Sequence, residues 1–281
     1  MLQSKKQSFL LVNIVLALSC NCVNAFTTES PVSTFVKSTV LEPEASSIIY
    51  NELYPNTEYK LRMEIGRKDQ FEDDLTYMNE AISPDDPRLF KTYHEFPLNS
   101  MDSLLKIASQ EYTRINGDEP KSLLDLGSGC GRLVLYAGLV EGSYKEVHGI
   151  EIGKQLHNYA SKMIERGLDK GYFKDQKGNC TKTKISLHHG PAHENLHILK
   201  AADVIFCYAT VFSTDGFDPD LGTLILSAEW SEMLANACRK GTIVITTDRA
   251  LNPMHGWKLL QKLDVDNPSL LGSTGYINIK G

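Results

Sequence analysis

Residues 122–151 read SLLDLGSGCGRLVLYAGLVEGSYKEVHGIE, and this stretch decides the fold of the chain. It begins with an apolar run of strand length that carries an acid, Asp125. Three glycines follow, separated by single residues, and apolar residues then recur at helical spacing. Residues 147–151 are a second short strand pattern, which ends in Glu151. A strand, a tight glycine turn, a helix and a second strand make one βαβ unit.

The glycine turn has the spacing Gly127-x-Gly129-x-Gly131. Glycines at the carboxyl end of a parallel strand let a ligand approach the backbone and permit positive φ. An acid at the tip of the next strand, here Glu151, can accept both hydroxyls of a ribose. A dinucleotide site would favour G-x-G-x-x-G. The G-x-G-x-G spacing, with Asp125 two residues earlier, instead resembles the S-adenosylmethionine turn of class I methyltransferases. The alternative is a structural turn whose glycines serve helix–sheet packing.

Strand and helix patterns alternate along the rest of the chain. Further strands are expected at residues 185–188, 203–208, 241–247, 258–265 and 274–279. Helices are expected at residues 98–116, 154–166, 191–199 and 224–239, with loops at 167–183 and 210–222. This alternation predicts a doubly wound α/β fold: a mostly parallel, seven-stranded, Rossmann-like sheet with an N-terminal helical extension.

The amino terminus of this 281-residue chain has the pattern of a secretory signal peptide. Within residues 1–25, two lysines precede a short apolar core, and small residues offer a cleavage site. The core is too short for an ordinary transmembrane helix, so we expect no stable membrane span after cleavage. We divide the remainder into a transit-peptide-like or disordered segment (26–45), a helical extension (46–117) and an S-adenosylmethionine-binding methyltransferase domain (118–281).

The residues after the signal peptide suggest a final compartment. The Ala25-Phe26 junction resembles the bipartite presequences of algae with secondary plastids, such as diatoms. Two of the six cysteines leave with the signal peptide, and neither Cys130 nor Cys207 is well placed for a stabilising disulfide. This usage favours a reducing compartment. We therefore expect import into the plastid; the alternative is a secreted protein with a disordered amino terminus.

Charge and histidine spacing exclude some classes of partner. Removing residues 1–25 takes away two lysines and no acid, which moves the formal net charge from −6 to −8. A chain this acidic has no general attraction for nucleic acid, so we expect no nucleic-acid partner. We also expect a monomer. Residues 69–74 are expected to form a solvated charged face. The histidines at 188, 189, 193 and 197 lack the carboxylate or cysteine pattern of a zinc set, so we expect no metal site.

The segment Tyr93-His94-Glu95-Phe96 looks like the Tyr-Gly-Glu segment of the disruptor-of-telomeric-silencing family, the histone lysine methyltransferases without a SET domain. The glycine turn, the Gly-Ile-Glu that ends at Glu151 and the short tail at residues 247–253 fit the same pattern, so the likeness runs from residue 90 to the carboxyl terminus. It implies S-adenosylmethionine as cofactor. With the rule that ligands bind at the carboxyl ends of parallel strands, it nominates these cofactor-binding residues: Tyr93, Glu95, Phe96, Asp125, Gly127, Ser128, Gly129, Gly131, Arg132, Glu151, Ile152, Pro191 and Ala192.

The sequence departs from that family at two strand ends. The family's Asp-Phe after the third strand is Pro191-Ala192 here, so another group must contact the adenine. Its Asn-Asn after the fourth strand is Tyr208-Ala209, and its nucleosome-binding basic segments are missing. We nominate Tyr208 and Tyr276 as acceptor-site residues. The resemblance places Tyr276 near the lysine channel; the alternative is a core aromatic.

Methyl transfer from a sulfonium is an in-line displacement, which needs positioning and exclusion of water. No dedicated general base is required when the acceptor amine arrives neutral. We expect a methyltransferase whose first acceptor is a non-histone protein lysine and whose second is a small plastid metabolite. The changes at Pro191 and Tyr208 also allow a cofactor-binding regulatory protein without transfer activity. Trp230 and Met233, in an expected helix, are assigned to the core.

Overall fold

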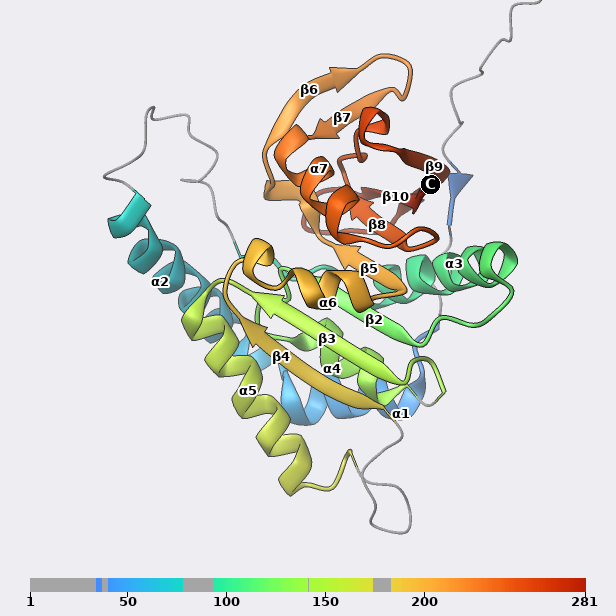
Figure 1. Ribbon diagram of the computed structural model, residues 1–281. Helices are drawn as coiled ribbons and strands as arrows, with labels where there is room; N and C mark the ends of the chain where they lie inside the picture. The colour runs from blue at the N-terminus through green and yellow to red at the C-terminus, as the bar shows by residue number, and fades with distance from the viewer. Residues whose placement is uncertain (1–33, 37–39, 78–92, 141, 174–182) are drawn as a thin grey trace, which may run out of the picture.

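The computed structural model describes residues 34–36, 40–77, 93–140, 142–173 and 183–281. They contain an eight-stranded sheet of order β1-β9-β10-β8-β5-β2-β3-β4 and a two-stranded sheet, β6-β7 (Figure 1). Neighbouring strands from β8 to β4 run parallel, whereas β10 is antiparallel to both β8 and β9. The strands are β1 Thr34–Phe35, β2 Ser122–Leu126, β3 Glu146–Glu151, β4 Lys184–His189, β5 Val204–Cys207, β6 Thr214–Asp218, β7 Thr223–Leu226, β8 Ile243–Thr247, β9 Trp257–Val265 and β10 Ser273–Lys280.

Helices cover both faces of the large sheet (Figure 1). On one face, α3 (Leu98–Asn116), α4 (Arg132–Leu139) and α5 (Lys154–Asp169) share a core with the strands. On the other face, α6 (Leu196–Ala201) and α7 (Ala228–Ala237) bury a second apolar cluster. Each helix that links two parallel strands therefore buries an apolar stripe against the sheet. This arrangement confirms the doubly wound, Rossmann-like fold.

The sheet has one strand more than the seven predicted. Thr34 and Phe35 of β1 pair in parallel with Leu263 and Asp264 of β9. A strand of two residues is too short to show an alternating pattern, so periodicity could not reveal it. β1 and the beginning of α1 (Pro43–Ser47) both lie in the segment that was expected to be transit-peptide-like or disordered.

A hairpin replaces part of an expected loop and the start of an expected helix. Residues 210–222 were predicted as a loop and 224–239 as a helix, but β6 and β7 pair antiparallel, and α7 begins at Ala228. Leu224, Ile225 and Leu226 suit a helix or a strand equally well by composition. Pairing with β6 on one side, and a bridge from Ile225 to Ala250 on the other, decides for the strand.

The amino-terminal helices pack on α4 and α5. Ile49, Leu53 and Tyr54 are fully buried in the core on that side of the sheet. The helices after α1 are a π-helical turn at Ile48–Leu53, a 3₁₀ turn at Asn56–Glu58 and α2 at Tyr59–Tyr77. The expected signal peptide lies outside the described residues, as does the plastid junction. Within the described ranges, no helix combines the length and apolarity needed to cross a membrane.

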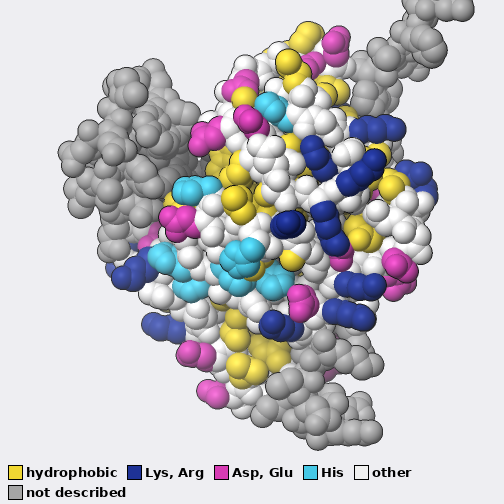
Figure 2. Space-filling view, in the orientation of Figure 1, with side chains coloured by type: hydrophobic (Ala, Val, Ile, Leu, Met, Phe, Trp, Pro, Cys, Tyr) yellow, Lys and Arg dark blue, Asp and Glu magenta, His cyan; other side chains and the backbone are white. Residues whose placement is uncertain are grey.

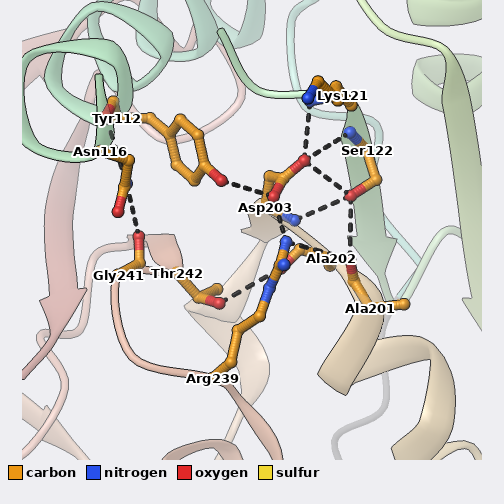
Figure 3. Close-up of polar contacts among 10 residues, drawn as sticks. All are labelled: Tyr112, Asn116, Lys121, Ser122, Ala201, Ala202, Asp203, Arg239, Gly241 and Thr242. Atoms are coloured by element: carbon orange, nitrogen blue, oxygen red, sulfur yellow. Dashed lines mark hydrogen bonds and ion pairs between the residues drawn. The ribbon is translucent and has the colours of Figure 1, made fainter. Parts of the chain in front are cut away.

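Asp203 joins several elements at the amino edge of the sheet (Figure 3). Its carboxylate accepts hydrogen bonds from the backbone N–H of Lys121 at 2.7 Å and of Ser122 at 3.0 Å, and from the Tyr112 hydroxyl at 2.6 Å. Arg239 forms an ion pair with it. Burial alone would raise the pKa of Asp203, but these hydrogen bonds and the ion pair hold it below its usual value.

Candidate active site

A cavity of about 820 Å³ lies at the carboxyl ends of β2, β3, β4 and β5. This is where an open parallel sheet binds ligands. With the exception of Gly131, the cofactor residues nominated from the sequence line this cavity. They are Tyr93, Glu95, Phe96, Asp125, Gly127, Ser128, Gly129, Arg132, Glu151, Ile152, Pro191 and Ala192.

The glycine turn brings bare backbone to the cavity wall. Gly127, Gly129 and Gly131 all have positive φ, at 82°, 54° and 78°. A Cβ on Gly129 would lie 2.7 Å from the Tyr93 ring, and one on Gly131 would lie 2.8 Å from the Cβ of Ala160 in α5. Neither space accepts a side chain, so the chain needs glycine at both positions. Gly131 thus serves the close packing of α4 on α5.

Glu151, at the end of β3, connects the two loops beside it. Its Oε2 accepts the N–H of Gly129 at 2.6 Å, and its Oε1 accepts the N–H of Gly153 at 2.7 Å. Its carboxylate also lines the cavity, at the strand end where ribose hydroxyls donate to an acid in nucleotide-binding sheets of this kind.

Asp125, at the end of β2, is incompletely satisfied. Its Oδ2 is buried and has no hydrogen-bond partner in the described part of the chain. Burial, and then the neighbouring charge of Glu151, raise the pKa of Asp125 to about 8. A ligand that carries a cationic or N–H donor group would supply the missing bond and stabilise the carboxylate. The amino group of S-adenosylmethionine meets that requirement, so the residues present fit this cofactor.

A buried ionic network holds the Tyr93–Phe96 segment against the turn. Glu95 pairs with Arg62 of α2 at 2.5 Å and lies 3.6 Å from Arg132 of α4. Burial alone would raise the pKa of Glu95, but the two arginines hold it below its usual value. The Tyr93 hydroxyl lies 2.9 Å from Glu95 Oε1 and 2.7 Å from the sulfur of Cys130. Arg62 was not nominated from the sequence, because no spacing links it to a partner 33 residues away.

Asp69 of α2 is a second residue that the sequence analysis missed. Residues 69–74 were assigned to a solvated face, but Asp69 is 5% exposed and lines the cavity, so that assignment is wrong for it. Its Oδ1 accepts from the N–H of Gln155 at 2.7 Å, and its Oδ2 from that of Leu156 at 2.6 Å. The residue before α5 is Gly153, which has no side chain to cap the helix. The absence of a capping side chain at Gly153 is the feature of the sequence that indicates an acceptor from elsewhere in the chain.

The two acceptor-site candidates lie in different places. Tyr208 follows β5 and lines the cavity, with its ring centroid 5.0 Å from that of Phe96. Its hydroxyl accepts from Asn267 Nδ2 at 3.2 Å. Tyr276, on β10, is 3% exposed and is not among the residues that line the cavity; its hydroxyl lies 2.6 Å from that of Thr223. The structure therefore brings Tyr208 to the site and places Tyr276 in an apolar cluster under β7.

An apolar wall closes another side of the cavity. Phe212, Trp230 and Met233 line it and are partly buried against the second core cluster. The rings of Phe212 and Trp230 have centroids 4.4 Å apart. Trp230 and Met233 were assigned to the core, which overlooked the side that faces the cavity. Pro191 and Ala192, which follow β4, line the same cavity. At this strand end they offer a ligand apolar contacts in place of a carboxylate.

Histidine side chains gather over β4 and its neighbours (Figure 2). His148 Nδ1 and His188 Nε2 lie 3.2 Å apart, and His189 Nε2 donates to the carbonyl of Ile152 at 3.1 Å. In the part of the chain that the structure describes, no group of three or more His, Cys, Asp or Glu residues is arranged to hold a metal ion.

Comparison with known proteins places the chain in a family. The family model described as histone methylation protein DOT1 matches residues 78–256. No curated protein matches the chain significantly. An RNA methyltransferase from Salinibacter ruber in complex with S-adenosyl-L-homocysteine is 22% identical, with a TM-score of 0.42, over 66% of this chain and 94% of that chain. The rRNA methyltransferase aviRa from Streptomyces viridochromogenes is 16% identical, with a TM-score of 0.45, over 66% of this chain and 85% of that chain.

The family match covers more than half of the chain. It includes the Tyr93–Phe96 segment, the glycine turn, Glu151 and Tyr208, which are the features that surround the cavity. The chain therefore belongs to the DOT1 family and is an S-adenosylmethionine-dependent methyltransferase.

Proposed function

We propose that this chain transfers the methyl group of S-adenosylmethionine to a lysine side chain of a non-histone protein. The charge of the cavity wall is the observation that supports a cationic acceptor. The described acidic residues that line it are Asp69, Glu95, Asp125, Glu151 and Glu229, against a single arginine, Arg132. Glu95 is balanced by Arg62 and Arg132, and the raised pKa of Asp125 leaves that carboxyl largely protonated at neutral pH. Asp69, Glu151 and Glu229 therefore supply the excess of negative charge that attracts cations, both the sulfonium cofactor and an amine that approaches from solution.

The aromatic side chain of Tyr208 supports the same acceptor. Tyr208 lines the cavity at the end of β5, and the buried ring of Phe96, whose centroid lies 5.0 Å away, packs against its ring. Aromatic faces attract ammonium groups, and removal of water around an amine lowers its pKa. The amine must lose its proton to solvent before transfer. Its nitrogen lone pair then forms the bond to the methyl carbon as the bond from carbon to sulfur breaks.

Two features argue against a histone as the acceptor. Tyr208 stands where the DOT1 family has an amide, so the family's acceptor contacts do not carry over residue by residue. The chain also has a net charge of −6 and offers no general attraction for the nucleic acid of chromatin.

The test is incubation of the purified protein with S-adenosylmethionine labelled in its methyl group and a lysate of the source organism. Label should appear in protein and, after acid hydrolysis, in methylated lysine. The matched variants are Glu151→Ala, which should lower labelling strongly at a cofactor concentration below saturation, and Glu119→Ala, which removes an exposed acid that does not line the cavity and should preserve labelling. Label recovered in RNA or in small molecules would contradict the proposed acceptor.

The location of the enzyme forms a second part of the proposal. Residues 1–45 should direct a fluorescent protein into the plastid, because the Ala25-Phe26 junction follows a signal peptide. Phe26→Ala should hold the same fusion earlier in the secretory route. Secretion of both fusions alike would leave a signal peptide and no plastid import.

A further inference from the structure

The β6–β7 hairpin projects from the body of the molecule (Figure 1), next to residues that line the cavity. An isolated two-stranded hairpin is only marginally stable in water, so contacts with the rest of the protein are needed to hold this one in place. Leu226 N–H donates to the carbonyl of Ala250 at 2.8 Å, and Ala250 N–H donates to that of Leu224 at 2.9 Å. The hydroxyls of Ser213 and Ser227 meet at 2.9 Å where the two strands join the body. β7 is thereby fixed, and β6 becomes the outer strand.

The outward face of this hairpin is apolar. Phe217 and Leu224 are paired across the two strands and are 64% and 40% exposed. Thr223 and Ile225, on the opposite face of β7, are buried. Paired residues lie on the same face of a sheet, so Phe217 and Leu224 form one exposed apolar spot. In the described structure, β6 pairs with β7 alone, and its other edge is open to an extended chain.

The hairpin is also acidic. Residues 214–226 contain Asp215, Asp218 and Asp220 and no basic residue. Asp215 and Asp220 are exposed, as is Glu229 at the start of α7. Lys262 approaches the turn from β9, where its Nζ lies 3.5 Å from the carbonyl of Leu221. In Figure 2, acidic and hydrophobic side chains lie together over this region, at the top of the view.

The hairpin leads directly into the cavity. Phe212 and Ser213, immediately before β6, line the cavity, and so does Glu229, in the first turn of α7, which follows β7. A chain that lies along β6 therefore has one end beside residues that line the cavity.

We propose that the β6–β7 hairpin binds an extended, positively charged segment of the protein acceptor, next to the lysine that enters the cavity. This inference rests on the proposed function. Main-chain bonds to the open edge of β6 supply affinity, while Phe217 with Leu224 and the aspartates select apolar and basic side chains. The same negative charge repels RNA.

The test is binding of a fluorescent synthetic peptide of alternating lysine and leucine, measured by anisotropy. A peptide of alternating glutamate and leucine and a single-stranded RNA oligonucleotide serve as comparison probes. The hairpin variant is the pair Phe217→Ser and Asp220→Lys. Its matched control is the pair Ile115→Ser and Glu119→Lys, an exposed apolar and an exposed acidic residue at the opposite edge of the sheet.

The wild-type protein should bind the lysine peptide, and the hairpin variant should bind it about fivefold more weakly or worse, whereas the control should stay within about twofold. Both variants should keep the wild-type affinity for S-adenosylmethionine, which shows that they are folded. Equal peptide affinity for the hairpin variant and the control, or tighter wild-type binding of the RNA or the glutamate peptide, would overturn the inference.

The two proposals can fail separately. Methyl transfer to a small molecule, with peptide binding that still depends on the hairpin, would refute lysine transfer and retain the docking site. Methyl transfer to protein lysine by the hairpin variant at the wild-type rate, with unchanged peptide affinity, would refute the docking site alone.

Discussion

Two acids at neighbouring strand ends have different chemistry because their hydrogen-bond partners differ. Both oxygens of Glu151 accept backbone N–H groups, from Gly129 and Gly153. Asp125 Oδ2 has no such partner among the described residues, and the pKa of Asp125 rises to about 8. Sequence spacing could place both acids at the edge of the sheet. It could not show which of them is satisfied, because that depends on the loop conformations.

Glu151→Ala should weaken S-adenosylmethionine binding by about tenfold or more. The change removes charge-assisted hydrogen bonds to the ribose, each about 1.5–3 kcal/mol, and a tenfold change corresponds to about 1.4 kcal/mol. It also frees the N–H groups of Gly129 and Gly153, which shape the two loops. Calorimetric titration measures the affinity, with Glu119→Ala as the control. Wild-type affinity in Glu151→Ala would rule out the assigned role.

Tyr208→Ala should leave cofactor affinity nearly unchanged and lower turnover on the acceptor. Tyr208 lines the cavity at the end of β5, where loss of the ring removes a wall for the acceptor and no bond to the ribose. Tyr208→Phe keeps the ring contact with Phe96 and loses the hydrogen bond from Asn267, so it should retain most of the turnover. A loss of thermal stability together with cofactor affinity would mean that Tyr208 is a packing residue. Normal turnover would place the acceptor elsewhere.

At the scale of elements, a local signal was enough to predict α3, whereas elements defined by strand pairing or by distant contacts were missed. The predicted helix at 98–116 matches α3, because an αL glycine, Gly117, ends it. The hairpin was missed because Gly216, Pro219 and Gly222 resemble loop punctuation. The contribution of α2 to the site depends on contacts with residues far along the chain, which periodicity does not contain.

Asp69→Ala should lower the free energy of unfolding by about 1–3 kcal/mol, because it leaves two N–H groups at the start of α5 without acceptors. Asp69→Asn should cost less, since the amide oxygen still accepts one of these bonds. Glu64→Ala, on the exposed side of the same helix, is the matched control. Urea titration provides the measurement. If Asp69→Ala is no less stable than Glu64→Ala, then α2 does not cap α5 in solution.

Across the whole molecule, the two edges of the sheet are built differently. At the amino edge, Asp203 is surrounded by donors from α3, β2 and the turn before β8 (Figure 3). At the carboxyl edge, the buried Oδ2 of Asp125 has no hydrogen-bond partner among the residues that the structure describes. The amino edge therefore stabilises the fold, while the carboxyl edge leaves this acceptor for a ligand. A residue pattern shows that Asp203 precedes one apolar strand and that Asp125 lies near the end of another. The hydrogen-bond donors of Asp203 come from 81 to 91 residues away, and Arg239 from 36.

These two aspartates should give opposite dependences of stability on pH. The pKa of Asp125 is raised by folding from 3.8 to about 8, so its contribution to stability is present below about pH 4 and is lost as the pH rises toward 8. The pKa of Asp203 is lowered by folding, so its contribution is present above about pH 4 and is lost as the pH falls through the lowered value.

Relative to Asp125→Asn, the free energy of unfolding of the wild-type protein should fall between about pH 4 and about pH 8. Saturating S-adenosylmethionine should reduce that fall, because donors from the cofactor stabilise the charged carboxylate. Relative to Asp203→Asn, the wild-type protein should be more stable at neutral pH and should lose that advantage as the solution is acidified. Urea midpoints at several pH values, with and without cofactor, measure both effects. If the difference in free energy of unfolding between the wild-type protein and Asp125→Asn stays constant over this range, then the Asp125 carboxylate has a hydrogen-bond partner in solution even without the cofactor.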